Sequence, residues 1–99
     1  MSEERIKKLL GLLDNENALL SELHALGYTI WSKEILAELA FRLRDETQFS
    51  FSEGVERVHK HLFPGISKKA REENALGWLC QFGKPTYFIV AALIAKEMK

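Results

Sequence analysis

Cysteine is almost absent from this sequence: its 99 residues include a single one, Cys80. One cysteine excludes a disulfide within the chain and a zinc site built from several cysteines. It fits a reducing compartment, so we expect a cytoplasmic protein. The N-terminal stretch mixes acidic and basic residues and lacks the continuous apolar segment of a secretion signal, so we expect it to belong to the fold.

The chain also lacks an excess of charge of either sign, with 14 Lys and Arg residues against 14 Asp and Glu residues. A neutral chain has no overall field that attracts nucleic acid or acidic substrates. A nucleic-acid site would therefore have to be a local patch. Low net charge also removes repulsion between copies, which permits self-association. Hydrophobic residues make up 46% of the chain and charged residues 28%, which predicts one globular domain over residues 1–99.

Long hydrophobic runs are missing as well. The longest extends from Tyr87 to Ala95, about half of the roughly 20 residues that a membrane-spanning helix needs, so a membrane span is excluded on length. A helix that is apolar on nearly every side is surrounded on nearly every side. We predict that this helix runs through the middle of the fold, or that a partner covers one of its faces. Its candidate interface residues are Tyr87, Val90 and Ile94.

Helical periodicity dominates the rest of the chain. Apolar residues keep helical spacing through residues 3–26, interrupted by the polar segment at 14–17. Either one helix or two would give this pattern. We favour a break between Gly11 and Asn15, because glycine is a poor helix-interior residue and Asp14 and Asn15 are good N-caps. Gly27 is expected to end the second segment.

Later helix boundaries follow from capping residues and helix breakers. Pro64 and Gly65 should end one helix near Leu62 or Phe63, and Gly83 with Pro85 should end the next. The other boundary predictions are a cap at Ser32 with a Trp31–Leu36 hydrophobic staple, a Ser50–Glu53 capping box, a cap at Ser67, and Thr86 as a cap or Pro85 in the first turn of the last helix. No pair of strands is expected. The sequence predicts a compact all-α bundle of five to six helices with a central C-terminal helix.

No arrangement of residues predicts catalysis, a cofactor or a bound metal. Glu56 and His59 have the i, i+3 spacing of some metal-binding bundles, but His61 points to a different face and no matching ligands follow. We interpret these histidines as solvated residues of a helix surface. Cys80 lies on a helix with a broad apolar surface and is expected in the core. A nucleophile elbow and a glycine-rich phosphate loop are both missing.

A local basic cluster is the candidate contact for phosphate or an acidic partner. Lys68, Lys69 and Arg71 stand at the expected start of a helix, where positive charge opposes the helix dipole. Residues that break a local rule in this way can mark function. Glu72 and Glu73 follow at once, however, and mixed charge is the ordinary condition of a surface. Plain surface therefore remains the favoured interpretation of the cluster.

Elimination leaves hydrophobic recognition as the favoured function. Aromatic residues make up 10% of the chain, and either most of them fill the core or some form an interface. We predict a small helical protein–protein interaction or regulatory module that binds another protein or a second copy of itself as a homodimer. The alternative is a nucleic-acid-associated regulatory protein that uses the local basic patch. A small enzyme or carrier with an unrecognised site comes third.

Overall fold

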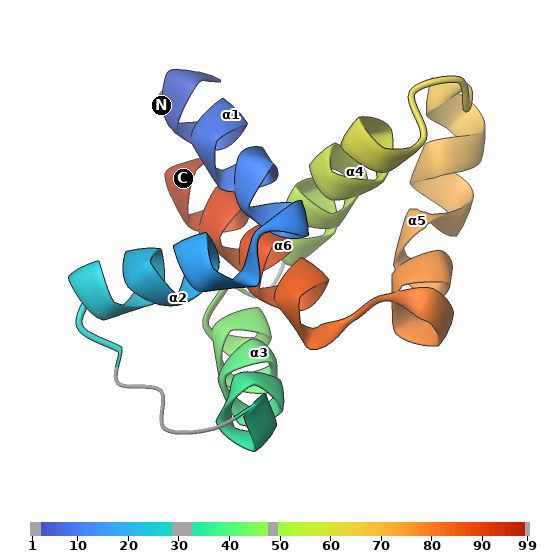
Figure 1. The fold of residues 1–99 in the computed structure, drawn as a ribbon. Coiled ribbons are helices and arrows are strands. Elements are labelled where there is room, and N and C mark those ends of the chain that lie inside the picture. The colour runs from blue at the N-terminus through green and yellow to red at the C-terminus, as the bar shows by residue number, and fades with distance from the viewer. Residues whose placement is uncertain (1–2, 29–32, 48–49, 99) are drawn as a thin grey trace.

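The structure of the chain is a computed structural model that describes residues 3–28, 33–47 and 50–98. The elements in chain order are α1 (Glu3–Gly11), the 3-10 helix η1 (Leu12–Asp14), α2 (Glu16–Ala25), α3 (Lys33–Thr47), α4 (Phe51–Leu62), α5 (Lys68–Phe82) and α6 (Pro85–Glu97), as Figure 1 shows. Every regular element in these residues is helical, so the predicted all-α bundle is confirmed. None of the described helices is both long and apolar enough to cross a membrane.

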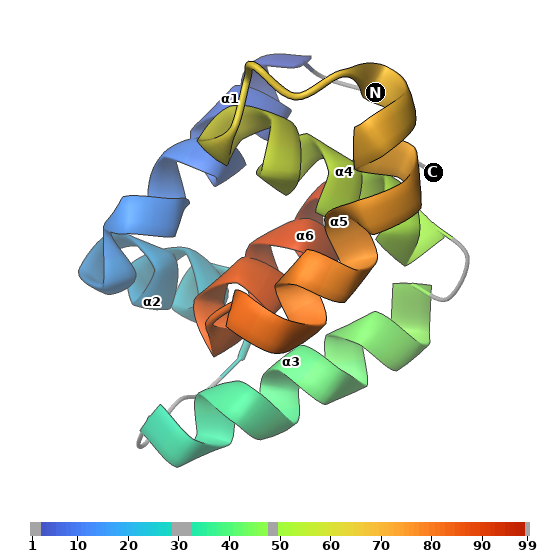
Figure 2. The ribbon, with the colours of Figure 1, turned by 90° about the vertical axis from the view of Figure 1, so that its right-hand side faces the viewer.

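Helix α6 forms the centre of the fold, as the apolar run predicts. It packs against α1, η1, α3 and α4, which surround it in both ribbon views (Figures 1 and 2). Every residue from Ile89 to Ala95 is buried. Complete burial of a large aliphatic side chain contributes about 1.5–3 kcal/mol, so this single helix supplies a large part of the core.

The first segment divides as predicted. Helix α1 ends at Gly11, η1 follows, and the side chain of Asn15 caps α2 by accepting a hydrogen bond from the backbone N–H of Ala18 at 3.1 Å. Gly27 then closes α2 with φ +94°, in the left-handed region that favours glycine. The Tyr28 N–H reaches back to the Leu23 carbonyl at 3.0 Å, which satisfies one of the free carbonyls at the helix end.

Other boundary predictions have mixed outcomes. Ser67 caps α5 through the N–H of Ala70 at 3.3 Å, and Pro85 occupies the first turn of α6. The capping box is wrong: Ser50 itself has helical backbone angles, and its side chain caps no N–H. The predicted cap at Ser32 and the staple that involves Trp31 lie outside the described residues.

A glycine permits a close contact between α4 and α6. Gly54 is buried on α4 directly against the backbone of Ala91 on α6, and a Cβ at this position would overlap the Ala91 carbonyl oxygen. Only hydrogen fits there, so the α4–α6 spacing depends on Gly54. Helix α5, in contrast, packs chiefly on α4, on the outer side of the bundle.

Candidate functional site

An open groove separates α3 from α5. Helix α5 stands at the right-hand edge of the molecule in Figure 1 and α3 at its lower edge, with α6 between them. The groove has a volume of about 540 Å³, and its described lining residues are Arg44 and Asp45 from α3, Phe51 from α4, Leu76 and Cys80 from α5, and Phe88 from α6. We call it the α3–α5 groove. Its apolar lining makes it the strongest candidate for recognition of another molecule.

The aromatic rings of α4 and α6 form the base of this groove. Phe51 is buried and Phe88 is partly buried, and their ring centroids lie 6.1 Å apart with the planes inclined by 13°. Such a stacked pair is held by packing with the surrounding helices. The base of the groove is therefore a preformed apolar surface.

Helix α5 carries two apolar faces, of which one is covered. Arg71, Ala75 and Leu79 recur every four residues and are buried on the inner face. Leu76 and Cys80 form a second stripe that lines the groove, and Leu76 is 47% exposed. The prediction of a core cysteine is wrong, because Cys80 is exposed. Its position is turned by about 100° from Leu79, out of the narrow stripe that packs inward.

A glycine without a structural explanation lies beside this second stripe. Gly77 is exposed within α5, and a Cβ added there would meet no atom within 4 Å. Glycine inside a helix costs about 1 kcal/mol relative to alanine. Gly77 lies three residues before Cys80, a spacing that places both on one side of the helix. The outer side of α5 is therefore open to close approach by another backbone.

The α3 wall of the groove combines charge with an exposed ring. The guanidinium of Arg44 lies over the ring of Phe41, 5.0 Å from its centroid, and Phe41 is 56% exposed. Arg44 also pairs with Asp45, with 3.3 Å between Nη2 and Oδ1. This wall therefore offers one charge of each sign next to an aromatic surface.

An aromatic cluster joins α4 to α5, and it contains His59. The imidazole is buried, with its centroid 5.2 Å from that of Phe63 and 5.4 Å from that of Trp78. The interpretation of His59 as a solvated residue is wrong, because α5 covers it. Burial lowers the pKa of His59, and the positive charge of Arg71 lowers it further. Among the described residues, no group of three or more His, Cys, Asp and Glu could hold a metal ion.

The three residues of the predicted basic cluster lie in different surroundings. Arg71 is buried, and its Nη2 donates to the backbone carbonyls of Phe63 at 3.1 Å and Ile66 at 2.9 Å. Lys68 pairs with Glu72, with 3.8 Å between Nζ and Oε1. Lys69 alone is exposed without an ion pair to a described residue. Arg71 thus fastens the turn between α4 and α5, and its spacing with Ala75 and Leu79 is the sequence signal of that inward position.

The predicted interface residues of α6 point into the fold. Val90 and Ile94 have no exposed surface within the chain itself, so no face of theirs is open to a partner. Tyr87 is partly buried and stacks on Trp78 with 6.2 Å between the ring centroids. Exposed large hydrophobic side chains of the described residues lie elsewhere: Phe41 on α3, Leu76 and Phe82 on α5, and Leu26, Phe63 and Ile66 in connecting segments.

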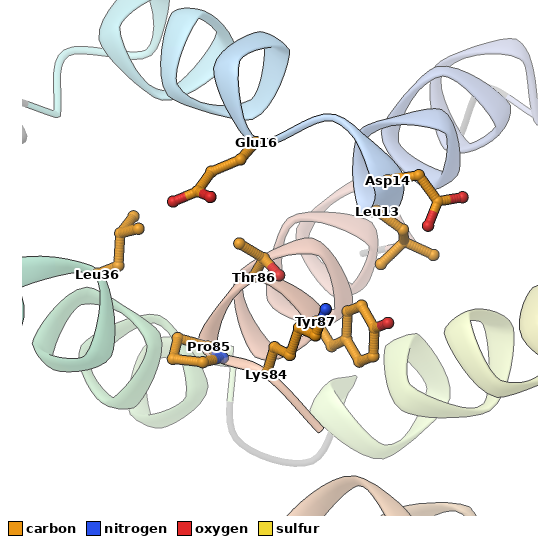
Figure 3. A pocket seen from close by; sticks show the side chains of 8 residues that line it. All are labelled: Leu13, Asp14, Glu16, Leu36, Lys84, Pro85, Thr86 and Tyr87. Carbon is orange, nitrogen blue, oxygen red and sulfur yellow. The ribbon is translucent and has the colours of Figure 1, made fainter. Parts of the chain in front are cut away.

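A second opening lies at the N-terminus of α6. Figure 3 shows its lining residues, which come from η1, α2, α3 and the start of α6, and its volume is about 400 Å³. The lining combines the carboxylates of Asp14 and Glu16 with Lys84, and in Figure 3 the Asp14 carboxylate points away from Thr86. Charges of both signs without a convergent arrangement do not define a ligand.

Comparison with protein families, with curated proteins and with solved structures finds no match to this chain.

Proposed function

We propose that the protein is a small helical interaction module that uses the α3–α5 groove as its binding surface, with α5 of a second copy as the occupant. The observation that carries this proposal is the second apolar face of α5. That face forms one wall of an apolar groove, and it is itself an apolar helix surface of the kind that such a groove accepts.

Because the outer face of α5 borders the groove that would receive it, the same surface can pair with a second copy of itself. In a two-fold symmetric dimer the same patch of each copy contacts the other, so α5 of each copy can enter the groove of its partner. Gly77 lets the two backbones approach closely, since no side chain stands above it. Lys69 and Glu73 on α5, and Arg44 and Asp45 on α3, supply both signs of charge to each side, so like charges need not oppose one another.

The exposed side chains predict a reversible dimer. Leu76 lines the groove and is 47% exposed, and Phe41, which lies under the guanidinium of Arg44 on α3, is 56% exposed, so the apolar area that a partner copy covers is modest. Association itself costs at least about 4 kcal/mol, so we expect a weak dimer with a dissociation constant of about 1 mM.

Sedimentation of the parent chain over a wide concentration range tests the proposal. We expect a monomer–dimer equilibrium that Leu76→Glu abolishes, because the new carboxylate would be buried in the interface. Leu26→Glu is a matched control, since Leu26 is also 47% exposed but lies at the end of α2. A parent chain that stays monomeric at millimolar concentration would contradict the proposed dimer. Equal loss of dimer formation in Leu76→Glu and Leu26→Glu would contradict it too.

Cys80 provides an independent measurement in the same groove. Because it is exposed and is the one cysteine of the chain, a thiol-reactive reagent modifies a single site. Dimer formation should slow this modification as protein concentration rises, and Leu76→Glu should restore the fast rate. Reactivity that does not change with concentration, in a sample that sedimentation shows to be dimeric, would place the interface elsewhere.

The two other predicted functions have less support. Nucleic-acid binding through Lys68, Lys69 and Arg71 requires three cations that face one ligand, and the guanidinium of Arg71 is engaged with backbone carbonyls. A small enzyme or carrier remains a prediction without a described site.

A further inference from the structure

A cleft between α1 and α4 brings together basic residues that are far apart in the sequence. Its volume is about 380 Å³, and its described lining residues are Glu3, Ile6, Lys7 and Leu10 from α1, Arg57, Lys60 and His61 from α4, and Pro64. We call it the α1–α4 cleft. Ile6, Leu10 and Pro64 give it apolar walls, while the remaining lining residues carry charged or hydrogen-bonding groups.

The balance of charge in this cleft differs from that of the whole chain. Lys7, Arg57 and Lys60 are positive and Glu3 is negative, which leaves a local charge of +2 in a protein whose formal net charge is zero. Within the described residues neither Lys7 nor Lys60 forms an ion pair, whereas Lys8 on the same turn of α1 pairs with Glu22. Two cations of the cleft are therefore available to a ligand.

A carboxylate of the chain already shows how the cleft holds an anion. Arg57 binds Glu3 in a bidentate manner, with Nη2–Oε1 at 2.9 Å and Nη1–Oε2 at 3.3 Å. This hydrogen bonding lowers the pKa of Glu3, and the positive charges of Arg57, Lys7 and Lys60 lower it further. The electrostatic influence of all three cations therefore reaches one carboxylate.

We propose that the α1–α4 cleft binds the phosphate or diphosphate group of a small ligand, whose oxygens replace the Glu3 carboxylate on Arg57 and pair with Lys7 and Lys60. A guanidinium presents two parallel N–H donors that match phosphate as well as carboxylate, and lysines add mobile point charges. A phosphate carries more charge than Glu3 and can engage several cations at once. His61 adds a ring nitrogen at the same cleft.

The distribution of charge favours a small ligand over a nucleic-acid strand. A strand is held by a stripe of cations that follows its backbone, and neutralisation of many phosphates gives it a strong salt dependence. Here Lys7, Arg57 and Lys60 lie around one cleft, and Glu53 and Glu56 occupy other positions of α4. The site therefore fits one or two phosphate groups. It is independent of the α3–α5 groove.

Calorimetric titration with inorganic phosphate and with pyrophosphate, at constant ionic strength set by sodium chloride, tests this site. We expect saturable binding of pyrophosphate with one site per chain. Lys60→Gln should weaken it at least about tenfold, because a charge-assisted hydrogen bond to the ligand is lost. Glu3→Gln should strengthen it, because the competing carboxylate is removed. Lys69→Gln, at an exposed position on α5, is the matched control and should bind like the parent.

Because Lys60→Gln should weaken binding and Glu3→Gln should strengthen it, the two variants together with the Lys69→Gln control distinguish a specific site from nonspecific charge attraction. Thermal unfolding of each variant without ligand verifies that it is folded, and all three positions are exposed. Absence of pyrophosphate binding to the parent at low salt would overturn the proposal. Equal weakening by Lys60→Gln and Lys69→Gln, or weakening by Glu3→Gln, would overturn it too. Affinity for single-stranded oligonucleotides that rises steadily with length would replace the small ligand by a nucleic acid.

Discussion

Replacement of Gly54 by alanine adds one methyl group at a close contact between α4 and α6. The added Cβ would overlap the carbonyl oxygen of Ala91, and it would lie 2.8 Å from that carbonyl carbon and 3.3 Å from the Ala91 Cα. Carbon atoms in good contact are about 3.5–4.0 Å apart. All three obstructing atoms belong to the backbone of α6, so a side-chain rotation cannot relieve the contact, and α4 must move away.

The size of the effect follows from that movement. Helix α4 has 12 residues, so it is about 18 Å long and about 10 Å wide. A separation of about 1 Å would open roughly 180 Å³ between the helices, which costs about 4 kcal/mol at about 24 cal/mol per Å³. Alanine recovers about 1 kcal/mol of helix propensity. We therefore expect a net loss of about 3 kcal/mol in the free energy of unfolding.

Gly77→Ala is the matched control, because it makes the same chemical change within a helix at an open position. It should raise the free energy of unfolding by up to about 1 kcal/mol. Urea unfolding monitored by circular dichroism, at a concentration where the parent is monomeric, measures both variants. A Gly54→Ala protein that is as stable as the parent would refute the close contact between α4 and α6.

Three further perturbations test the interior. Burial and Arg71 lower the pKa of His59, so below about pH 6.5, the ordinary pKa of histidine, the unfolded chain binds more protons than the folded one and stability should fall. Urea titrations from pH 5 to 8 measure this dependence of the free energy of unfolding on pH. His59→Gln should remove the dependence, and exposed His24→Gln should keep it. Val90→Asp should abolish the helical circular dichroism signal, because an unpaired carboxylate would be buried, whereas Leu26→Asp should stay folded. Arg71→Met should lower the urea midpoint, because two carbonyls lose their donor, and Lys69→Met should leave it unchanged.

The central helix is the feature that the sequence predicts most directly. A run of apolar residues at every position of a helix has no solvent-compatible face, so α6 must be enclosed whatever the rest of the chain does. Local capping chemistry also predicts Asn15, Gly27 and Ser67, because each acts within four residues of its own position. These predictions depend on spacing along one helix, which the sequence states explicitly.

The side of each helix that meets a neighbour is harder to predict. Cys80 and Leu79 are adjacent and both apolar, and only the position of α4 decides which of them is buried. His59 is polar and becomes buried because Trp78 and Phe63 cover it. Periodicity gives the width of an apolar stripe but not the element that covers it. The same limit explains why the sequence groups Arg71 with Lys68 and Lys69 although the structure buries it.

Neither candidate site can be predicted from local sequence patterns, because each combines residues from separate helices. Glu3 and Arg57 are 54 positions apart, and the charge of the α1–α4 cleft appears only when α1 and α4 both pack on α6. The α3–α5 groove likewise joins Asp45 to Phe88.

Helix α5 has one stripe that packs inside the chain and one that faces outward. Its inner stripe fastens it to α4, while its outer stripe adds little to the stability of the single chain, because Leu76 stays half in water and Gly77 weakens the helix. Gly77 costs folding stability, and a Cβ in its place would meet no atom of the described chain. A second molecule that packs against α5 at this position would explain the glycine. Gly54 and Gly77 then have one physical role, since each keeps a helix surface low enough for a second helix to approach. At Gly54 the second helix is α6, and at Gly77 it is α5 of the proposed partner copy.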